Sequence, residues 1–449
     1  MFSAKGLAIF FVLVLSMSVF ADGMIVNPDM MPVRQDRQEA FIVHENGIQS
    51  MVLMVNLQEA INTTESHVWI FPVPAKPEDI SIANLKGFPA MTGKDVKTQL
   101  TDNLFFLEAY MTTAAFPPFV IFPLLMIATP MNSYSNGMPM ADLRTTQDSY
   151  GVDIYQHIDK YGLATEVIKA DDVVRFESYL NARGTNLSDE AESFLTEYMG
   201  KDYSFVVSWI SDPEEAREVT GNNDYYYRQT NPIGVFVRFP SENVFFPLKP
   251  TAYYGTDSFP VIVNVKGFFN PEIYQNVKES TTISHHQVDF WRRTISEEES
   301  LRQVFGENIP SSLLFTRIQI NSQAQYFTED LSFTRSEAWS PHIMNFFNQT
   351  WIFWFVVLFA LSGLVSASLT KRVLKLNWTH LDVVELSVAN FFSIIGAGIV
   401  MAVIPKNRFN VEEKSSFEKR LLSLAVFEGF FLVATVILFL VTLLMLAVK

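Results

Sequence analysis

The expected architecture follows from the apolar stretch WIFWFVVLFALSGLVSASL, which occupies residues 351–369. As a helix, a stretch of this length crosses about 30 Å of hydrocarbon, and it contains no charged side chain. Two further stretches, residues 381–404 and 421–448, are also long and apolar enough to cross. We therefore expect residues 350–449 to form a three-helix transmembrane bundle.

The N-terminus has the features of a secretory signal peptide. Lys5 precedes an apolar run over residues 7–15, and Val19 and Ala21 occupy the two positions that a signal peptidase reads. The sequence predicts cleavage after Ala21, which makes residues 1–21 the leader. The alternative is an anchor that is never cleaved.

Export sets the expected orientation. Residues 22–349 would form an extracytoplasmic domain, and the first span would place the basic turn at residues 371–375 in the cytoplasm. The loop at residues 405–420 would then face outward although five of its residues are Lys or Arg, against the tendency of basic loops to remain inside. We expect a multi-pass protein of the cell membrane with its large N-terminal domain outside.

Charge is unevenly distributed along the chain. Residues 22–349 contain 23 Lys and Arg against 42 Asp and Glu, whereas residues 350–449 contain 9 against 6. The acidic domain lacks the positive field that nucleic acid or anionic lipid requires, so cations or basic partners suit it better, although excess carboxylate also serves solubility alone. There are no cysteines, which excludes disulfides and thiolate chemistry.

Three carboxylates within the expected spans are the candidate functional residues, because an ionisable group is costly in a membrane. Asp382 and Glu385 lie in the first turns of the second span, where an interfacial structural role competes with a functional one. Glu428 lies about two turns into the third span, where a polar contact and a role in coupling or partner binding are both open. Small residues at four-residue spacing are expected to pack the helices closely.

The extracytoplasmic domain has an α+β pattern. Asn46 and Gly47 are typical of a tight hairpin turn and separate strand-like runs at residues 39–44 and 49–57; with residues 67–73 these predict a β-meander. A helical pair follows, and then further strands. The expected helices are residues 171–182 and 188–199, and the expected later strands are residues 203–210, 233–239 and 260–266.

Two stretches depart from this pattern. Residues 112–131 are nearly all apolar but contain four prolines, which predicts either an extended core segment or a loop that enters the bilayer or docks on the helices. Residues 281–301 are polar and helix-like. Their adjacent His285 and His286 would point to different sides of a helix, which disfavours a metal site.

The segment HVWIFPVPAKPE, residues 67–78, resembles the Trp-aliphatic-aliphatic-Pro-Val-Pro segment of an uncharacterised exported prokaryotic family, carried as a domain of unknown function. The segment ADGM at residues 21–24, around the expected cleavage point, is similar to the opening of that family. The resemblance spans about residues 21–265, but its members often have Cys-rich or Gly-rich sequence where this chain has its apolar Pro-rich insert. It implies export and an α+β fold, and it transfers no catalytic residue. Further similar segments are residues 40–44, 179–184, 203–207, 232–240 and 246–248.

No hydrolase elbow, phosphate loop, zinc motif or dinucleotide fingerprint is present, so the sequence predicts no catalytic, cofactor or metal site. We expect a membrane-anchored binding, structural or partner-interaction protein that contacts the bilayer and other envelope proteins but not nucleic acid. One alternative is an envelope hydrolase that uses carboxylates or His44, His67 and His157. Another is a subunit of a transport or signalling complex.

Overall fold

The computed structural model describes residues 24–26, 38–55, 67–89, 91–114, 153–220, 233–290, 295–390, 393–409 and 416–447. The chain divides into two compact units. The sheet unit comprises residues 1–94 and 135–339, and the helical unit comprises residues 95–134 and 340–449. The expected leader at residues 1–21 lies outside the described residues.

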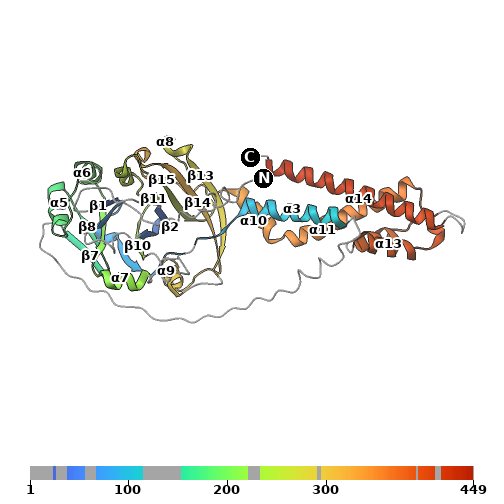
Figure 1. Ribbon diagram of the computed structural model, residues 1–449, viewed down its shortest axis with the longest axis horizontal. Helices are drawn as coiled ribbons and strands as arrows, with labels where there is room; N and C mark the ends of the chain where they lie inside the picture. Colours follow the sequence, from blue (N-terminus) through green and yellow to red (C-terminus); the bar gives the residue numbers. More distant parts are fainter. Residues whose placement is uncertain are drawn as a thin grey trace, which may run out of the picture. The chain divides into compact units, whose positions relative to one another are not determined.

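An eight-stranded sheet forms one side of the sheet unit (Figure 1). The predicted hairpin is confirmed: Asn46 and Gly47, with positive φ angles of 52° and 73°, connect two antiparallel strands. In spatial order the strands are β5 (Ser81–Leu85), β10 (Ile233–Pro240), β3 (Ile48–Val55), β2 (Gln38–Glu45), β12 (Ser258–Lys266), β14 (Ser312–Gln323), β13 (Thr281–Asp289) and β6 (Lys94–Asp95). The pair β2–β12 is parallel, and it joins the hairpin to the antiparallel strands that follow β12.

The third strand of the expected β-meander belongs to a second sheet, which has five strands. The predicted meander is therefore wrong. In spatial order the strands of this second sheet are β1 (Met24–Val26), β4 (Val68–Val73), β9 (Ser204–Ile210), β8 (Leu163–Lys169) and β7 (Asp153–Lys160), all antiparallel. Every residue of β4 is buried. A strand covered on both faces needs neighbours on both edges, and β1 and β9 supply them.

The helical pair predicted beside these strands is confirmed. Helix α5 (Val173–Asn181) begins at Asp172, whose side chain accepts a hydrogen bond from the Arg175 N–H, and α6 (Asp189–Thr196) begins at Ser188 in the same way. One face of α5 buries an aromatic pair and Leu180 against the five-stranded sheet. The later strands expected at residues 203–210, 233–239 and 260–266 are also confirmed, as β9, β10 and β12.

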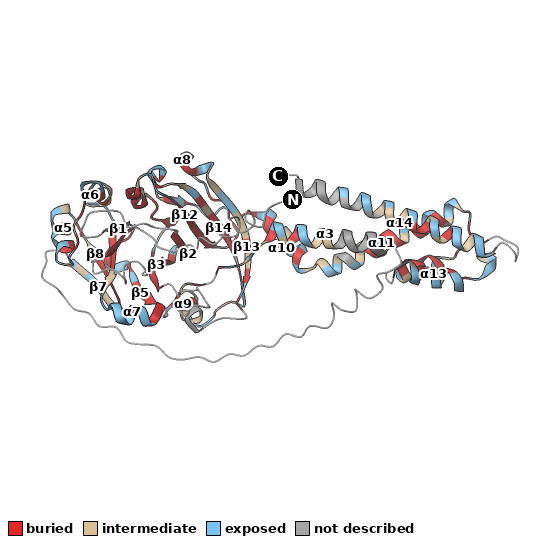
Figure 2. Ribbon diagram, viewed as in Figure 1, coloured by how far each residue is buried: buried red, intermediate tan, exposed pale blue. Residues whose placement is uncertain are grey.

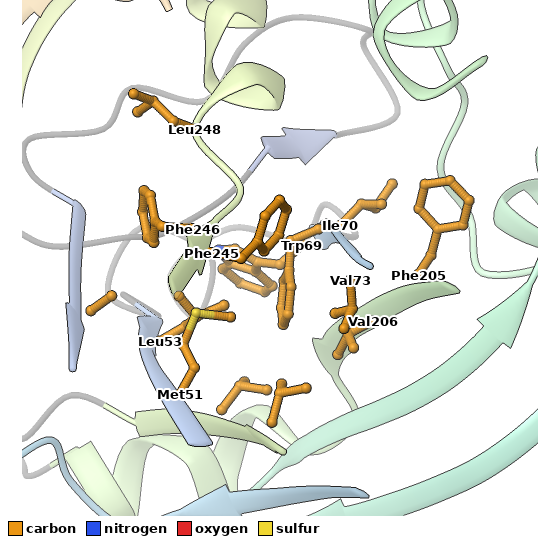
Figure 3. Packing of buried hydrophobic residues seen from close by; sticks show 14 of the residues in the cluster. Met51, Leu53, Trp69, Ile70, Val73, Phe205, Val206, Phe245, Phe246 and Leu248 are labelled. Atoms are coloured by element: carbon orange, nitrogen blue, oxygen red, sulfur yellow. The ribbon is translucent and has the colours of Figure 1, made fainter. Parts of the chain in front are cut away.

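Side chains from both sheets meet in one hydrophobic core (Figure 3). Met51 and Leu53 reach it from β3, and Trp69 and Val206 reach it from the five-stranded sheet. Trp69 is only 1% exposed. Truncating an aromatic side chain at such a position costs about 3–5 kcal/mol, so this contact is a principal source of stability in the sheet unit.

Residues 281–301 do not form the expected polar helix. The first half is strand β13, which pairs along its whole length with β14, and helix α9 (Ile295–Phe305) begins only afterwards. His285 and His286 therefore project to opposite faces of a sheet. His286 stacks on Phe315, and its ring nitrogens contact the Ser284 hydroxyl and the Gly93 carbonyl, which is a structural role.

The helical unit is built around two long helices. They are α11 (Trp351–Val373) and α14 (Ser416–Ala447), which pack against each other. Helix α3 (Val96–Ala114) packs on both of them, and α10 (Trp339–Gln349) leads into α11. The shorter helices α12 (His380–Ala389) and α13 (Ser393–Val403) complete the unit. Beyond Ala114, the apolar stretch expected at residues 112–131 lies outside the described residues.

The expected three-helix transmembrane bundle is wrong. Among the described residues one helix, α11, is long and apolar enough to cross a membrane. The expected second span, residues 381–404, is divided between α12 and α13. Each is about 16 Å long, half of what a crossing requires. A hydropathy window averages over such an interruption and cannot detect it.

The chain enters and leaves the α12–α13 pair at the same end of the helical unit. The backbone N–H of Asn377, before α12, donates to the carbonyl of Arg408, after α13, at 2.8 Å. The Arg408 guanidinium also lies 3.8 Å from the Asp382 carboxylate. The expectation that the loop at residues 405–420 lies opposite the basic turn at residues 371–375 is therefore wrong for its described first part: residues 405–409 lie beside the segment that follows this turn.

Candidate functional site: an anionic pocket in the sheet unit

The three carboxylates singled out from the sequence lie in different environments. Asp382 closes a capping box with Thr379 at the start of α12, which is a structural role. Glu385 is exposed on the same helix. Glu428 is 7% exposed on α14, and neither of its carboxylate oxygens has a hydrogen-bond partner among the described residues.

The three histidines of the hydrolase alternative are not brought together. His44 lies on β2 and contacts the Ser241 carbonyl at 2.8 Å. His157 lies on β7, whereas His67 directly precedes β4 in the same sheet. Two strands separate β4 from β7, a distance of about 14 Å. Acid–base catalysis requires hydrogen-bond reach, so this geometry argues against that alternative.

An open pocket of about 520 Å³ lies in the sheet unit, where the β2–β3 turn meets the segment between β10 and β11 (Val244–Phe246) and the start of β15 (Leu331–Phe333). Two carboxylates, Asp330 and Glu242, line it together with the ring of Tyr203. The described residues that line the pocket include no lysine or arginine. The other polar lining residues are Ser241, Asn243 and Ser332.

The wall of the pocket is held by hydrogen bonds from β2 and β3. The Gln49 side chain donates to the Phe245 carbonyl at 2.6 Å and accepts from its N–H at 2.8 Å. The N–H of Ser241 donates to the Gly47 carbonyl at 2.9 Å, while His44 contacts the Ser241 carbonyl. Because Gln49 is completely buried, these bonds fix the wall before any ligand arrives.

Asp330 is the central polar group of the pocket. Its carboxylate accepts from the Tyr198 hydroxyl at 2.9 Å and from the Lys249 backbone N–H at 2.9 Å. Burial raises the pKa of Asp330 to about 6, and these hydrogen bonds only partly offset the shift. Burial also raises the pKa of Tyr198, which therefore stays a neutral donor. Asp330 is thus an anion at neutral pH; the nearby Lys249 ammonium also lowers its pKa, but that ammonium forms its ion pair with Glu197.

A second buried carboxylate, Glu166, belongs to a closed network. Arg183 donates to it at 2.6 Å, His157 contacts it at 2.9 Å, and the Tyr179 hydroxyl also donates to it. The Arg183 guanidinium stacks between the rings of Tyr179 and Trp209, at 3.6 and 4.6 Å. Both carboxylate oxygens are engaged, so the network serves the fold and offers no binding site.

Sequence reasoning did not find the pocket. Its residues come from five segments between Gly47 and Ser332, and no short spacing connects them. No group of histidine, aspartate and glutamate side chains among the described residues is arranged to hold a metal ion. No protein-family model matches the chain, and no curated protein or solved structure matches it.

Proposed function

We propose that this chain is a membrane-anchored binding protein whose sheet unit recognises a basic group, an amine or a guanidinium, in the anionic pocket. The observation that carries the proposal is Asp330, a carboxylate in the pocket wall, where none of the described lining residues is positively charged and the nearby Lys249 ammonium pairs with Glu197. The Tyr203 ring beside it offers a second attraction for a cation. The acidic balance of residues 22–349 favours the approach of a positively charged partner.

Helix α11 supports the anchoring part of the proposal. It is long and apolar enough to cross a membrane, and large apolar side chains are exposed along it (Figure 2). Contiguous apolar exposure of this kind is unfavourable in water and fits contact with lipid or with another membrane protein. The exposed side chains are Ile352, Phe353, Val356, Leu361, Val365 and Leu369.

We also propose that residues 1–21 direct export and that the sheet unit lies outside the cytoplasm, in contact with other envelope proteins. The resemblance of residues 67–78 to an exported family supports this. Intact-mass measurement should show cleavage after Ala21, and the sheet unit should be digested by protease in intact spheroplasts. A protected sheet unit would contradict the orientation.

The binding test uses the full chain in detergent micelles and calorimetric titration with two short peptides. One carries lysine and arginine, and its control carries acetyl-lysine and citrulline at the same positions. We expect only the basic peptide to bind, with affinity rising as the pH rises through about 6, because Asp330 then ionises. Asp330→Asn should weaken binding at least tenfold, while Asp171→Asn, at an exposed site outside the pocket, should leave it unchanged. Equal binding of both peptides would refute the proposal.

A further inference from the structure

The interior of the helical unit contains polar side chains that the fold leaves without partners. Glu428 is 7% exposed and Asn390 is fully buried. Neither the two oxygens of Glu428 nor the amide oxygen and nitrogen of Asn390 make a hydrogen bond within the part of the chain that the structure describes. Buried polar groups are nearly always hydrogen-bonded because leaving them unsatisfied is costly, so the joint presence of these two points to a bound species.

The packing of the helices places these two residues at one level. Helices α11 and α12 are antiparallel, and Gly363 meets Ser387, so Asn390, one turn further along α12, lies level with residue 360. Helices α11 and α14 are also antiparallel, and Phe359 packs on Phe431, so Glu428 lies level with residue 362. The two levels differ by about 3 Å along the axis.

Glu428 faces the interior between four helices, and Asn390 is fully buried at the end of one of them. Helix α12 packs on α11 and α13, and α14 packs on the same two helices, so α12 and α14 occupy opposite corners. Glu428 lies one turn from Leu424, which approaches Gly398 of α13, and one turn from Phe431, which contacts Phe359 of α11. Glu428 therefore lies on the face of α14 that is turned towards the interior.

The surroundings supply negative but no positive charge. The sequence contains no lysine or arginine in residues 351–370, 393–403 or 421–447. Helix α12 ends at Asn390, so its C-terminal carbonyls bring the negative end of a helix dipole to the same level as Glu428. Arg420 is engaged two turns away with the carbonyls of Met401 and Ile404.

We propose that Glu428 and Asn390 bind a small monovalent metal cation, with Na⁺ as the probe. A carboxylate, an amide oxygen and the carbonyl end of a helix form the oxygen-rich environment that such an ion requires, and broken helices place carbonyl ends at ion sites in membrane proteins. A proton would neutralise Glu428 but would leave the Asn390 side-chain amide, which has no partner among the described residues, without a ligand. The site lies in the helical unit and is independent of the anionic pocket.

The test is calorimetric titration of Na⁺ into the full chain in micelles, with a bulky organic cation as the only other cation. We expect saturable binding of one Na⁺ per chain. Glu428→Gln should weaken it at least a hundredfold and Asn390→Ala about tenfold, whereas Glu385→Gln, at an exposed acid on α12, and Asp330→Asn, in the pocket, should leave it unchanged.

A second measurement does not depend on the folding of any variant. A hydrophobic carbodiimide should modify Glu428 in the wild-type chain, and Na⁺ should slow that modification in the same concentration range in which it binds. Absence of saturable Na⁺ binding, or modification that responds to pH but not to Na⁺, would overturn the proposal and leave a site for a proton alone.

Discussion

At the scale of single residues, Asp330 imposes a measurable stability cost. Its folded pKa of about 6 lies above its ordinary value of 3.8, so the folded state holds the proton more tightly than the unfolded state. The contribution of protonated Asp330 to the free energy of unfolding is fully present below pH 4 and is lost as the pH rises through 6. Asp330→Asn should therefore raise the free energy of unfolding by about 3 kcal/mol at pH 8, and by about 1 kcal/mol at pH 4.5. Urea denaturation at the two pH values measures the difference; a gain that is equal at both would contradict the assignment.

Removing Arg183, in contrast to removing the charge of Asp330, is expected to destabilise the fold. Its side chain is 11% exposed, and it neutralises Glu166, whose side chain is 4% exposed. Arg183→Ala leaves a buried carboxylate without its counter-ion, and should lower the free energy of unfolding by about 3–5 kcal/mol. Arg175→Ala, which removes an exposed ion pair with Asp172, is the control and should cost less than about 1 kcal/mol. Similar losses for the two variants would show that the Glu166 network is not structural.

Residue-level prediction from the sequence succeeded where the physics is local. The Asn46-Gly47 turn and the caps at Asp172 and Ser188 depend on the backbone geometry of a few consecutive residues. Asp330 and Tyr198 share a hydrogen bond although they lie 132 positions apart. No spacing rule connects them, so the centre of the pocket could be found only from the fold.

At the scale of elements, the contact between α11 and α12 depends on Gly363. A Cβ atom there would lie 3.0 Å from the Ser387 Cα, a backbone atom that cannot move aside alone. Gly363→Ala should lower the midpoint of thermal unfolding of the helical unit, followed by helical circular dichroism in micelles. Gly429→Ala is the matched control because a Cβ there meets nothing within 4 Å, and it should be neutral or raise helix stability by up to about 1 kcal/mol. Equal effects would show that Gly363 does not govern this packing.

The chain enters α12 and leaves α13 at the same end of the helical unit, and cross-linking can test this. The protein has no native cysteine, so only an engineered pair can form a disulfide. Asn377 and Arg408 share a backbone hydrogen bond, which places their Cα atoms within disulfide range. Asn377→Cys combined with Arg408→Cys should form a disulfide on mild oxidation in native membranes. Were residues 381–404 a complete span, the two positions would lie about 30 Å apart and no cross-link would form. Asn377→Cys with Phe353→Cys is the negative control.

Element prediction failed in two places for related reasons. The position of residues 67–73 directly after the hairpin predicts a meander, yet β4 is buried along its whole length and lies in the other sheet. The high mean hydropathy of residues 381–404 predicts one helix, yet α12 ends at Asn390. Sequence order and average composition carry no information about which partner covers a segment, whereas periodicity did identify α5 and α6.

At the scale of the whole molecule, the helical unit is assembled from two distant parts of the chain. Asn348 of α10 donates to the Val96 carbonyl at 2.9 Å and accepts from the Asn103 side chain at 3.2 Å, both on α3. Asn348→Leu leaves these groups without their partner and should cost about 1–3 kcal/mol. Hydrogen exchange should then accelerate in α3 and not in β4. Unchanged exchange in α3 would mean that this amide does not hold the helix.

The charge asymmetry recognised in the sequence agrees with this division only in part. The acidic residues 22–349 include α3, which the structure assigns to the helical unit. Composition distinguishes segments that favour water from segments that favour lipid, but α3 contains both polar and apolar side chains. Its place is set by contacts such as the one between Phe106 and Trp351, whose rings lie 5.9 Å apart.

The discontinuity of the helical unit has a consequence for biosynthesis. Helix α3 leaves the ribosome more than two hundred residues ahead of α11 and α14, on which it packs. At the usual speed of translation this is an interval of roughly 10–50 s, during which its apolar side chains have no permanent cover. Helix α3 is therefore made long before its packing partners and stays without them until the last helices emerge.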